Sequence, residues 1–219
     1  MKIKISDKKK AIIWDMDGVI SDTQRLHALV ESELLARYGI DINPKDMTAK
    51  YAGRRTEEVF SELLKEKGAV NYNIDELMRE KWERATALLD ELEPIPGVIN
   101  LIKEASTQRI PQSVASASGK KYVNAVLTKL GLISYFEAII TGDDISKGKP
   151  DPEIFLKAAS AMSVKPNDCV VVEDGRSGMT GAKKAGMLCI GLVYDKADYP
   201  ADILVNSLTK LKLKDFISC

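Results

Sequence analysis

Two aspartates directly follow the first apolar run of the chain. In AIIWDMDGVISDT (residues 11–23), four apolar residues lead into Asp15 and Asp17, and Gly18 comes next. Removing carboxylates from water is costly unless a positive charge compensates them. Such a pair can bind a metal ion, and one carboxylate can attack an electrophile while the other moves a proton. The sequence therefore raises the question of what positive charge these two groups face.

Further polar residues stand at comparable places after later apolar runs. Ser116 and Ser118 follow SVA, Lys149 comes a few residues after AIIT, and Glu173 and Asp174 follow CVVV. If these runs are parallel strands, their carboxyl ends meet at one edge of the sheet, where open α/β sheets bind ligands. Four strands would then deliver carboxylates, hydroxyls and an ammonium group to one site.

This combination of groups predicts phosphoryl transfer. Several carboxylates in one place need a hard divalent cation, and Mg²⁺ prefers oxygen ligands and commonly shares its coordination with a substrate phosphate. A hydroxyl and an ammonium suit phosphate oxygens as hydrogen-bond donors and neutralising charge. A carboxylate facing phosphorus can act as a nucleophile, and a second carboxyl group two residues away can protonate the leaving oxygen and later deprotonate water.

The elements that position these groups can be read from the apolar pattern. Short runs rich in Val and Ile have the character of strands buried on both faces, and segments with helical periodicity separate the later runs. This alternation predicts a Rossmann-like, doubly wound parallel α/β sheet. The expected strands are 11–14, 113–115, 138–141, 169–172, 188–193 and 202–205, and the expected helices are 119–131, 151–162 with Asp151 as N-cap and Pro152 at the first helical position, and 177–186.

Residues 20–93 break this alternation and show helical patterns only. We expect one helix from about residue 24 to 38 that stops at Gly39, one over 56–67 that stops at Gly68, and one that begins at Asn73 and is halted by the prolines at 94 and 96. The sequence thus predicts an α/β core made of residues 1–19 and 94–219, with an inserted all-helical cap domain at residues 20–93.

Composition limits the partners. The 219 residues include 32 basic and 32 acidic side chains, so nothing favours general attraction to nucleic acid or to an anionic membrane. No apolar run has the length of a signal peptide or a membrane span. Three cysteines without CxxC spacing fit core thiols in a reducing compartment, so we expect a cytoplasmic protein. The expected partner is a small phosphorylated substrate, bound by a monomer or weak homodimer without nucleic acid or membrane.

Four ordered motifs resemble those of the haloacid dehalogenase superfamily. They are DMDGV at 15–19, SAS at 116–118, GKPDPEIF at 148–155 and VVVEDGRSGMTGAKKAGM at 170–187. The helical insertion resembles the cap of the first subfamily, and the resemblance covers essentially the whole chain. With an aspartate at position 17 the chain is more similar to the phosphatase and phosphomutase branches, because dehalogenases lack this second aspartate. The resemblance implies a Mg²⁺-dependent phosphatase that acts on a sugar or polyol phosphate through an aspartyl-phosphate intermediate.

The resemblance also implies roles for the core residues. Asp15 would be the nucleophile and Asp17 the general acid/base. Asp15, the main-chain carbonyl of Asp17, and Asp174 would hold Mg²⁺, with Glu173 adjacent and orienting.

The resemblance further assigns Ser116 and Lys149 to the transferring phosphoryl group, and Ser118 is a candidate for substrate binding. Gly175 departs from the pattern, because relatives commonly have Ser after the Glu-Asp pair. This departure puts a hydrogen bond next to the metal site in doubt, although not the metal itself.

Candidates in the cap are Thr23, His27, Arg54, Arg55 and Arg84. A lone helical histidine is commonly an ordinary, partly exposed residue, yet the spacing DxDGVxxDTxxxH resembles that of β-phosphoglucomutases. Arginine can bind the non-transferring end of a substrate. The GRRT segment is more similar to sugar-phosphate and glycerol-phosphate phosphatases, since the mutases carry arginine where this chain has Thr56. Trp82 is expected in the core of the cap.

Three alternatives stay open at this point. The first is a β-phosphoglucomutase that interconverts β-glucose 1-phosphate and glucose 6-phosphate with the same core residues. The second is a phospho-acceptor signalling domain, which would need no cap of this length and would place its acceptor on a later strand. The third is an inactive binding module, although no catalytic residue is missing.

Overall fold

The computed structural model describes residues 8–195 and 197–218, which contain one six-stranded, all-parallel sheet in the order β3-β2-β1-β4-β5-β6. Each predicted apolar run forms a strand, with ends shifted by at most one residue. The doubly wound α/β fold is therefore confirmed. The strands are β1 (Ala11–Trp14), β2 (Gln112–Ala115), β3 (Ala138–Ile140), β4 (Cys169–Glu173), β5 (Leu188–Leu192) and β6 (Ile203–Val205).

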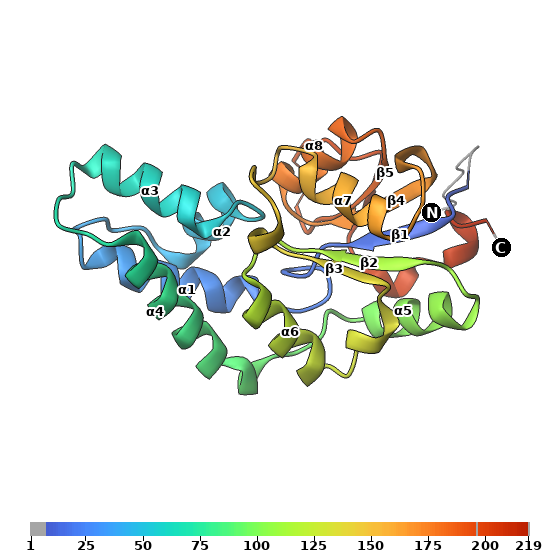
Figure 1. The fold of residues 1–219 in the computed structure, drawn as a ribbon, viewed down its shortest axis with the longest axis horizontal. Helices are drawn as coiled ribbons and strands as arrows, with labels where there is room; N and C mark the ends of the chain where they lie inside the picture. The colour runs from blue at the N-terminus through green and yellow to red at the C-terminus, as the bar shows by residue number, and fades with distance from the viewer. Residues whose placement is uncertain (1–7, 196, 219) are drawn as a thin grey trace.

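Helices cover both faces of this sheet (Figure 1). Alternate side chains of β1 point to opposite faces, so Ile12 and Trp14 pack with α5 and α6 while Ile13 packs with α7 and α8. Because both faces are buried, the strands are continuous apolar runs. The sheet helices are α5 (Val98–Thr107), which lies outside the predicted helices, α6 (Lys120–Lys129), α7 (Glu153–Ala161) and α8 (Arg176–Lys184).

Four further helices lie beyond one end of the sheet (Figure 1). They pack around an apolar core of their own that includes Leu34, Phe60 and Leu64. Three of them match predicted helices, and the third of these is capped by the side chain of Asn73, which accepts the backbone N–H groups of Asp75 and Glu76. The helices are α1 (Gln24–Ala36), α2 (Pro44–Tyr51), which was not predicted, α3 (Thr56–Lys67) and α4 (Ile74–Ala87). We refer to α1–α4 as the cap.

Two adjacent chain segments connect the cap to the sheet. The backbone N–H of Asp22 donates to the Glu93 carbonyl at 3.0 Å, and the N–H of Ile95 donates to the Ile20 carbonyl at 3.0 Å. The outgoing and returning connections are therefore hydrogen-bonded to each other, which gives the cap one narrow attachment.

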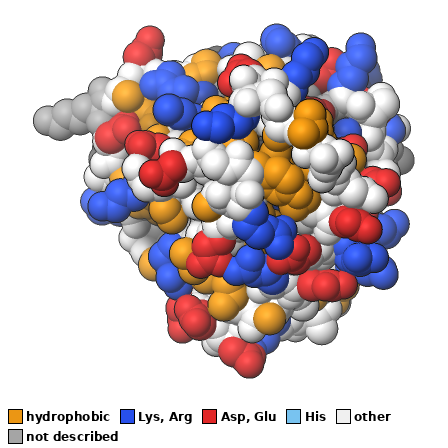
Figure 2. Space-filling model, turned by 90° about the vertical axis from the view of Figure 1, so that its left-hand side faces the viewer, with side chains coloured by type: hydrophobic (Ala, Val, Ile, Leu, Met, Phe, Trp, Pro, Cys, Tyr) orange, Lys and Arg blue, Asp and Glu red, His pale blue; other side chains and the backbone are white. Residues whose placement is uncertain are grey.

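Acidic and basic side chains are interspersed over the cap end of the molecule (Figure 2). Within the part of the chain that the structure describes, no helix combines the length and the apolar character needed to cross a bilayer.

Candidate active site

The carboxyl ends of β1 and β4 meet at a buried ion-pair network. Lys149 Nζ lies 2.6 Å from Asp15 Oδ1 and 2.7 Å from Glu173 Oε1, and it donates to the Ala115 carbonyl at 3.2 Å. The three charged side chains are at most 4% exposed. β1 and β4 are neighbours at the point where the strand order reverses, and such a point opens a crevice beyond the strand ends.

Asp174 completes an acidic cluster at this crevice. Carboxylate oxygens of Asp15, Glu173 and Asp174 lie within 4.8 Å of one another. Gln24 Nε2 donates to Asp174 Oδ2 and, at 3.0 Å, to the Asp17 carbonyl oxygen. Asp174 Oδ1 is buried and has no hydrogen-bond partner among the described residues. An all-oxygen cluster with an unpartnered buried carboxylate oxygen fits a hard divalent cation.

Burial controls the protonation of this cluster. It raises the pKa of Asp15 well above its usual range, against the lowering effect of Lys149. It also raises the pKa of Asp174, and the neighbouring Glu173 and Asp15 carboxylates add to the increase. Burial alone would lower the pKa of Lys149, but the two carboxylates in contact with it raise that pKa above its usual value. Ionising all three carboxylates would thus leave more negative charge than one ammonium can neutralise, and a bound cation would offset this excess.

Asp17 is held separately by four side-chain donors. Its Oδ2 accepts from Ser118 Oγ at 2.8 Å and from Ser116 Oγ at 3.1 Å, while Oδ1 accepts from Thr23 Oγ1 and lies 3.0 Å from His27 Nε2. Burial raises the pKa of Asp17, but the field of His27 and hydrogen bonds from His27, Thr23 and Ser118 outweigh burial, so the net pKa is lowered. The two aspartates at the end of β1 therefore stand in opposite electrostatic environments.

Aromatic rings surround His27 and join the cap to the sheet layer. The His27 ring centroid lies 5.6 Å from that of Trp82 on α4 and 4.8 Å from that of Tyr122 on α6. The Trp82 and Tyr122 centroids are 5.2 Å apart. The expectation that Trp82 belongs to the core of the cap is wrong, because its ring packs against a helix of the sheet layer and forms part of the contact between the two units.

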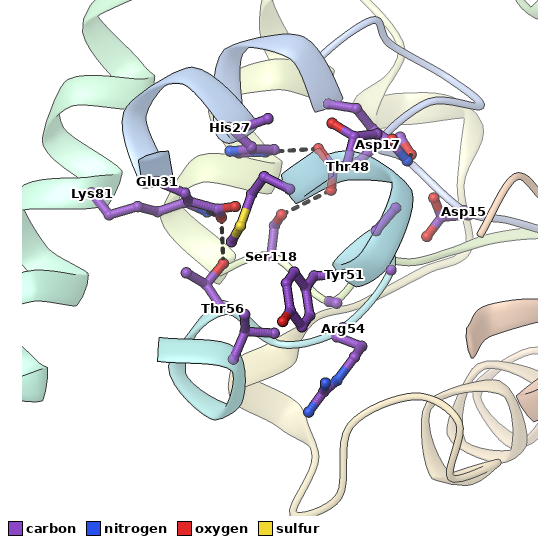
Figure 3. A pocket seen from close by; sticks show the side chains of 17 residues that line it. Asp15, Asp17, His27, Glu31, Thr48, Tyr51, Arg54, Thr56, Lys81 and Ser118 are labelled. Carbon is purple, nitrogen blue, oxygen red and sulfur yellow. Dashed lines mark hydrogen bonds and ion pairs between the residues drawn. The ribbon is translucent and has the colours of Figure 1, made fainter. Parts of the chain in front are cut away.

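A cleft that is partly open to solvent separates the sheet edge from the cap. Asp15, Asp17 and Ser118 line it from the sheet side, and Figure 3 shows Lys81, Glu31 and the other cap side chains around them. Gln24, Glu31 and Lys81 were not among the predicted site residues. Gln24 directly follows Thr23 in the first turn of α1, which was the available signal, whereas no sequence pattern separates Glu31 or Lys81 from other charged helical residues.

The three predicted arginines lie in different places. Arg54 lines the cleft. Arg55 pairs with Glu58 at 3.7 Å beside Gly148 and is not part of the lining, and Arg84 forms an outward-facing ion pair with Glu33, its side chain 39% exposed. The structure therefore brings Arg54, Thr23, His27 and all the predicted sheet-edge residues together, and it leaves Arg55 and Arg84 outside the cleft.

A family model for haloacid dehalogenase-like hydrolases matches residues 12–192. The chain belongs to this family. Its relatives include a β-phosphoglucomutase from Bacillus subtilis (strain 168), 33% identical over 94% of this chain and 92% of the relative. Another is the fructose-1-phosphate phosphatase YqaB of Escherichia coli (strain K12), 34% identical over 83% of this chain and 95% of the relative.

Solved structures of similar proteins cover the sheet and the cap together. CbbY from Rhodobacter sphaeroides, in complex with phosphate, superposes with a TM-score of 0.83 at 28% identity, over 95% of this chain and 99% of CbbY. β-Phosphoglucomutase from Clostridium difficile superposes with a TM-score of 0.82 at 28% identity, over 94% of each chain.

Gly175 of this haloacid dehalogenase-like hydrolase lies under a loop of the cap. Its backbone N–H donates to Glu173 Oε2 at 2.6 Å, so the main chain itself supplies a donor to this carboxylate. A Cβ atom at Gly175 would stand 3.0 Å from the Ala52 carbonyl oxygen, a tight contact. Glycine at this position therefore lets the loop between α2 and α3 approach the acidic cluster closely.

Proposed function

We propose that this haloacid dehalogenase-like hydrolase is a Mg²⁺-dependent phosphatase of small sugar or polyol phosphates that works through an aspartyl-phosphate on Asp15. The observation that supports this proposal most strongly is that the two aspartates at the floor of the cleft have different contacts. Asp15 contacts the Lys149 ammonium at 2.6 Å and borders the acidic cluster, whereas four donors fix Asp17. Relatives named as fructose-1-phosphate phosphatase and hexitol phosphatase B support the substrate class.

In the first half of the reaction, a carboxylate oxygen of Asp15 attacks phosphorus, and the bond from phosphorus to the ester oxygen breaks. Asp17 is ionised in the ligand-free cleft, so it must take up a proton when the substrate binds; it then gives this proton to the departing oxygen, and the alcohol leaves neutral. Lys149 neutralises charge on the phosphoryl oxygens, and Ser116 orients them by turning its hydroxyl from Asp17 to the phosphoryl group. In the second half, Asp17 takes a proton from water, which attacks phosphorus, releases phosphate and restores the Asp15 carboxylate.

Asp15, the main-chain carbonyl of Asp17, and Asp174 would hold Mg²⁺, and Glu173 would orient Lys149. When bound, the cation supplies charge that offsets the repulsion between Asp15 and the phosphoryl oxygens. The unpartnered Asp174 Oδ1 supports this assignment, because a buried carboxylate oxygen without a donor is expected to meet a ligand.

The cap closes the reaction off from water. His27 lies on α1 of the cap and contacts Asp17 at the sheet edge, so the Asp17 carboxylate has its full set of donors only when the cap is in place. The narrow paired connections at residues 20–22 and 93–95 give the cap an axis on which to open for substrate and product.

A phosphomutase is the second candidate, and one observation favours it. The His27–Asp17 contact places the cap histidine at the acid/base aspartate, and a β-phosphoglucomutase is 33% identical to the chain. The test is to supply β-glucose 1-phosphate with a glucose 1,6-bisphosphate primer. The phosphatase proposal predicts that inorganic phosphate forms faster than glucose 6-phosphate, and the reverse order would overturn it. Screening phosphate release from a panel of phosphorylated metabolites then identifies the substrate.

We also infer that the enzyme works in the cytoplasm. Cys169 and Cys189 are free, buried thiols, as expected in a reducing compartment.

A further inference from the structure

The cap side of the cleft has charged side chains that the proposed reaction does not use. Lys81 Nζ on α4 lies 3.5 Å from Glu31 Oε1 on α1, and Thr56 Oγ1 at the start of α3 donates to the same oxygen at 2.8 Å. All three residues line the cleft. Figure 3 shows Glu31 and Lys81 on the opposite side of the cleft from Asp15, where the part of a substrate remote from the reacting phosphate would lie.

The cations on this side already face partners. Lys81 is 1% exposed, and its Nζ lies 3.2 Å from the centroid of the Trp82 ring. Burial lowers the pKa of Lys81 to about 8, although Glu31 opposes this effect. Arg54 pairs with Glu62 at 2.7 Å. Lys81 and Arg54 are the Lys and Arg side chains that line the cleft within the described ranges. Each has a carboxylate partner, so neither offers an unpaired charge to an anionic group.

Glu31 is the group on this side that remains available to a ligand. Its side chain is 12% exposed. In the part of the chain that the structure describes, its ion pair and its hydrogen bond both use Oε1, so Oε2 can accept from a ligand. A carboxylate fixed in this way accepts hydrogen bonds from hydroxyl groups and repels a second anion.

We propose that Glu31, held in place by Lys81 and Thr56, is a specificity-determining residue that binds the hydroxyl groups of a neutral substrate tail and rejects a second phosphoryl group. This inference rests on the proposed phosphatase function and narrows it to monophosphate esters with a polyhydroxylated tail. A binding site can select its substrate by repelling a competing ligand as well as by attracting the correct one.

The test compares fructose 1-phosphate with fructose 1,6-bisphosphate as competitive inhibitors of p-nitrophenyl phosphate hydrolysis by the whole protein with Mg²⁺. Wild type should bind the monophosphate more tightly by about tenfold or more, because the bisphosphate places an anion against Glu31. Glu31→Gln keeps the shape and the acceptor for Thr56 but removes the charge, so the tenfold preference should fall to about twofold or less. Glu33→Gln, two residues further along the same helix and paired outward with Arg84, is the matched control and should retain the wild-type preference.

Each result of this comparison is decisive. Equal inhibition of wild type by the two sugars, or an unchanged preference in Glu31→Gln, would overturn the role of Glu31. If Glu31→Gln is inactive because Lys81 has lost its partner, the double variant Glu31→Gln/Lys81→Met, which removes both charges, replaces it. Its preference for the monophosphate over the bisphosphate is then compared with that of wild type in the same way. If wild type releases phosphate from neither p-nitrophenyl phosphate nor fructose 1-phosphate, the proposed function itself fails, which is a distinguishable outcome.

Discussion

Replacing Lys149 with Met removes the ammonium from the centre of the buried network. Among residues 8–195 and 197–218, Lys149 is the one cation recorded within hydrogen-bond distance of Asp15 and Glu173. Methionine keeps the apolar length of the side chain and leaves two buried carboxylates without their partner. The substitution therefore measures what the ion pairs contribute, with little change in packing.

The burial of the network sets the size of the effect. Removing one partner of a buried ion pair costs about 3–5 kcal/mol, and the carboxylates of Asp15 and Glu173 are too buried for water to screen them. Protonation of one carboxylate limits the cost, since each unit of pKa shift corresponds to about 1.4 kcal/mol. We therefore expect a loss of about 3–5 kcal/mol, a large share of the roughly 5–15 kcal/mol that stabilises a typical domain.

The assay is equilibrium urea unfolding at pH 7 with a chelator present, because a bound divalent cation would offset the missing charge. Lys147→Met is the control, since this neighbouring lysine is exposed on the same loop, and its free energy of unfolding should change by less than about 0.5 kcal/mol. Lys149→Met/Glu173→Gln should recover part of the loss, because it leaves one unpaired carboxylate in place of two. A loss below about 1 kcal/mol in Lys149→Met would refute the view that this network stabilises the site.

Two other substitutions test the backbone around the site. Gly18 has a φ of +91°, and a Cβ there would overlap Asp174. At Gly68, φ is +69° and nothing lies within 4 Å of a Cβ, so Gly68→Ala should lose about 1–2 kcal/mol of stability. Gly18→Ala should lose more than this in urea unfolding, and equal losses would contradict the overlap. Glu153 accepts a hydrogen bond from Lys157 and N–H groups of the loop before Lys149, which lowers its pKa to about 2. Its stabilising contribution is present above the usual pKa near 4.5 and is lost as the pH falls toward 2, so the unfolding free energies of wild type and Glu153→Gln should converge over that range. A gap independent of pH would be inconsistent with this role.

The strand ends could be predicted because parallel topology leaves little choice. Asp15, Lys149 and Glu173 are far apart in the chain, but each lies at or just beyond a short apolar run, and a parallel sheet brings the carboxyl ends of such runs to one edge. The start of α7 differed by one residue from its prediction. Pro152 precedes the helix, while Asp151 Oδ1 still accepts the Glu153 N–H at 3.0 Å, so the predicted capping residue supports the first turn.

Features that depend on tertiary packing could not be predicted from the sequence. α2 buries only Met47, so it lacks an apolar stripe, and its signals were Asn43 as N-cap and Pro44 at the first position. The run VINLI at the start of α5 does not differ from a strand by periodicity alone. Lys81 looks like a solvent-facing residue of α4 until Trp82 and Glu31 are seen around it.

Covalent labelling of Asp15 tests whether the reaction passes through an aspartyl-phosphate on this residue. The protein with Mg²⁺ is mixed with substrate, quenched in acid within the first turnover, and reduced with tritiated borohydride. This reagent converts an acyl phosphate to a tritium-labelled alcohol as phosphate is released, so that peptide mass spectrometry locates the labelled residue. We expect label on the peptide that contains Asp15, and neither label nor phosphate release in Asp15→Asn. Phosphate release by Asp15→Asn at the wild-type rate, or label on another residue, would contradict it.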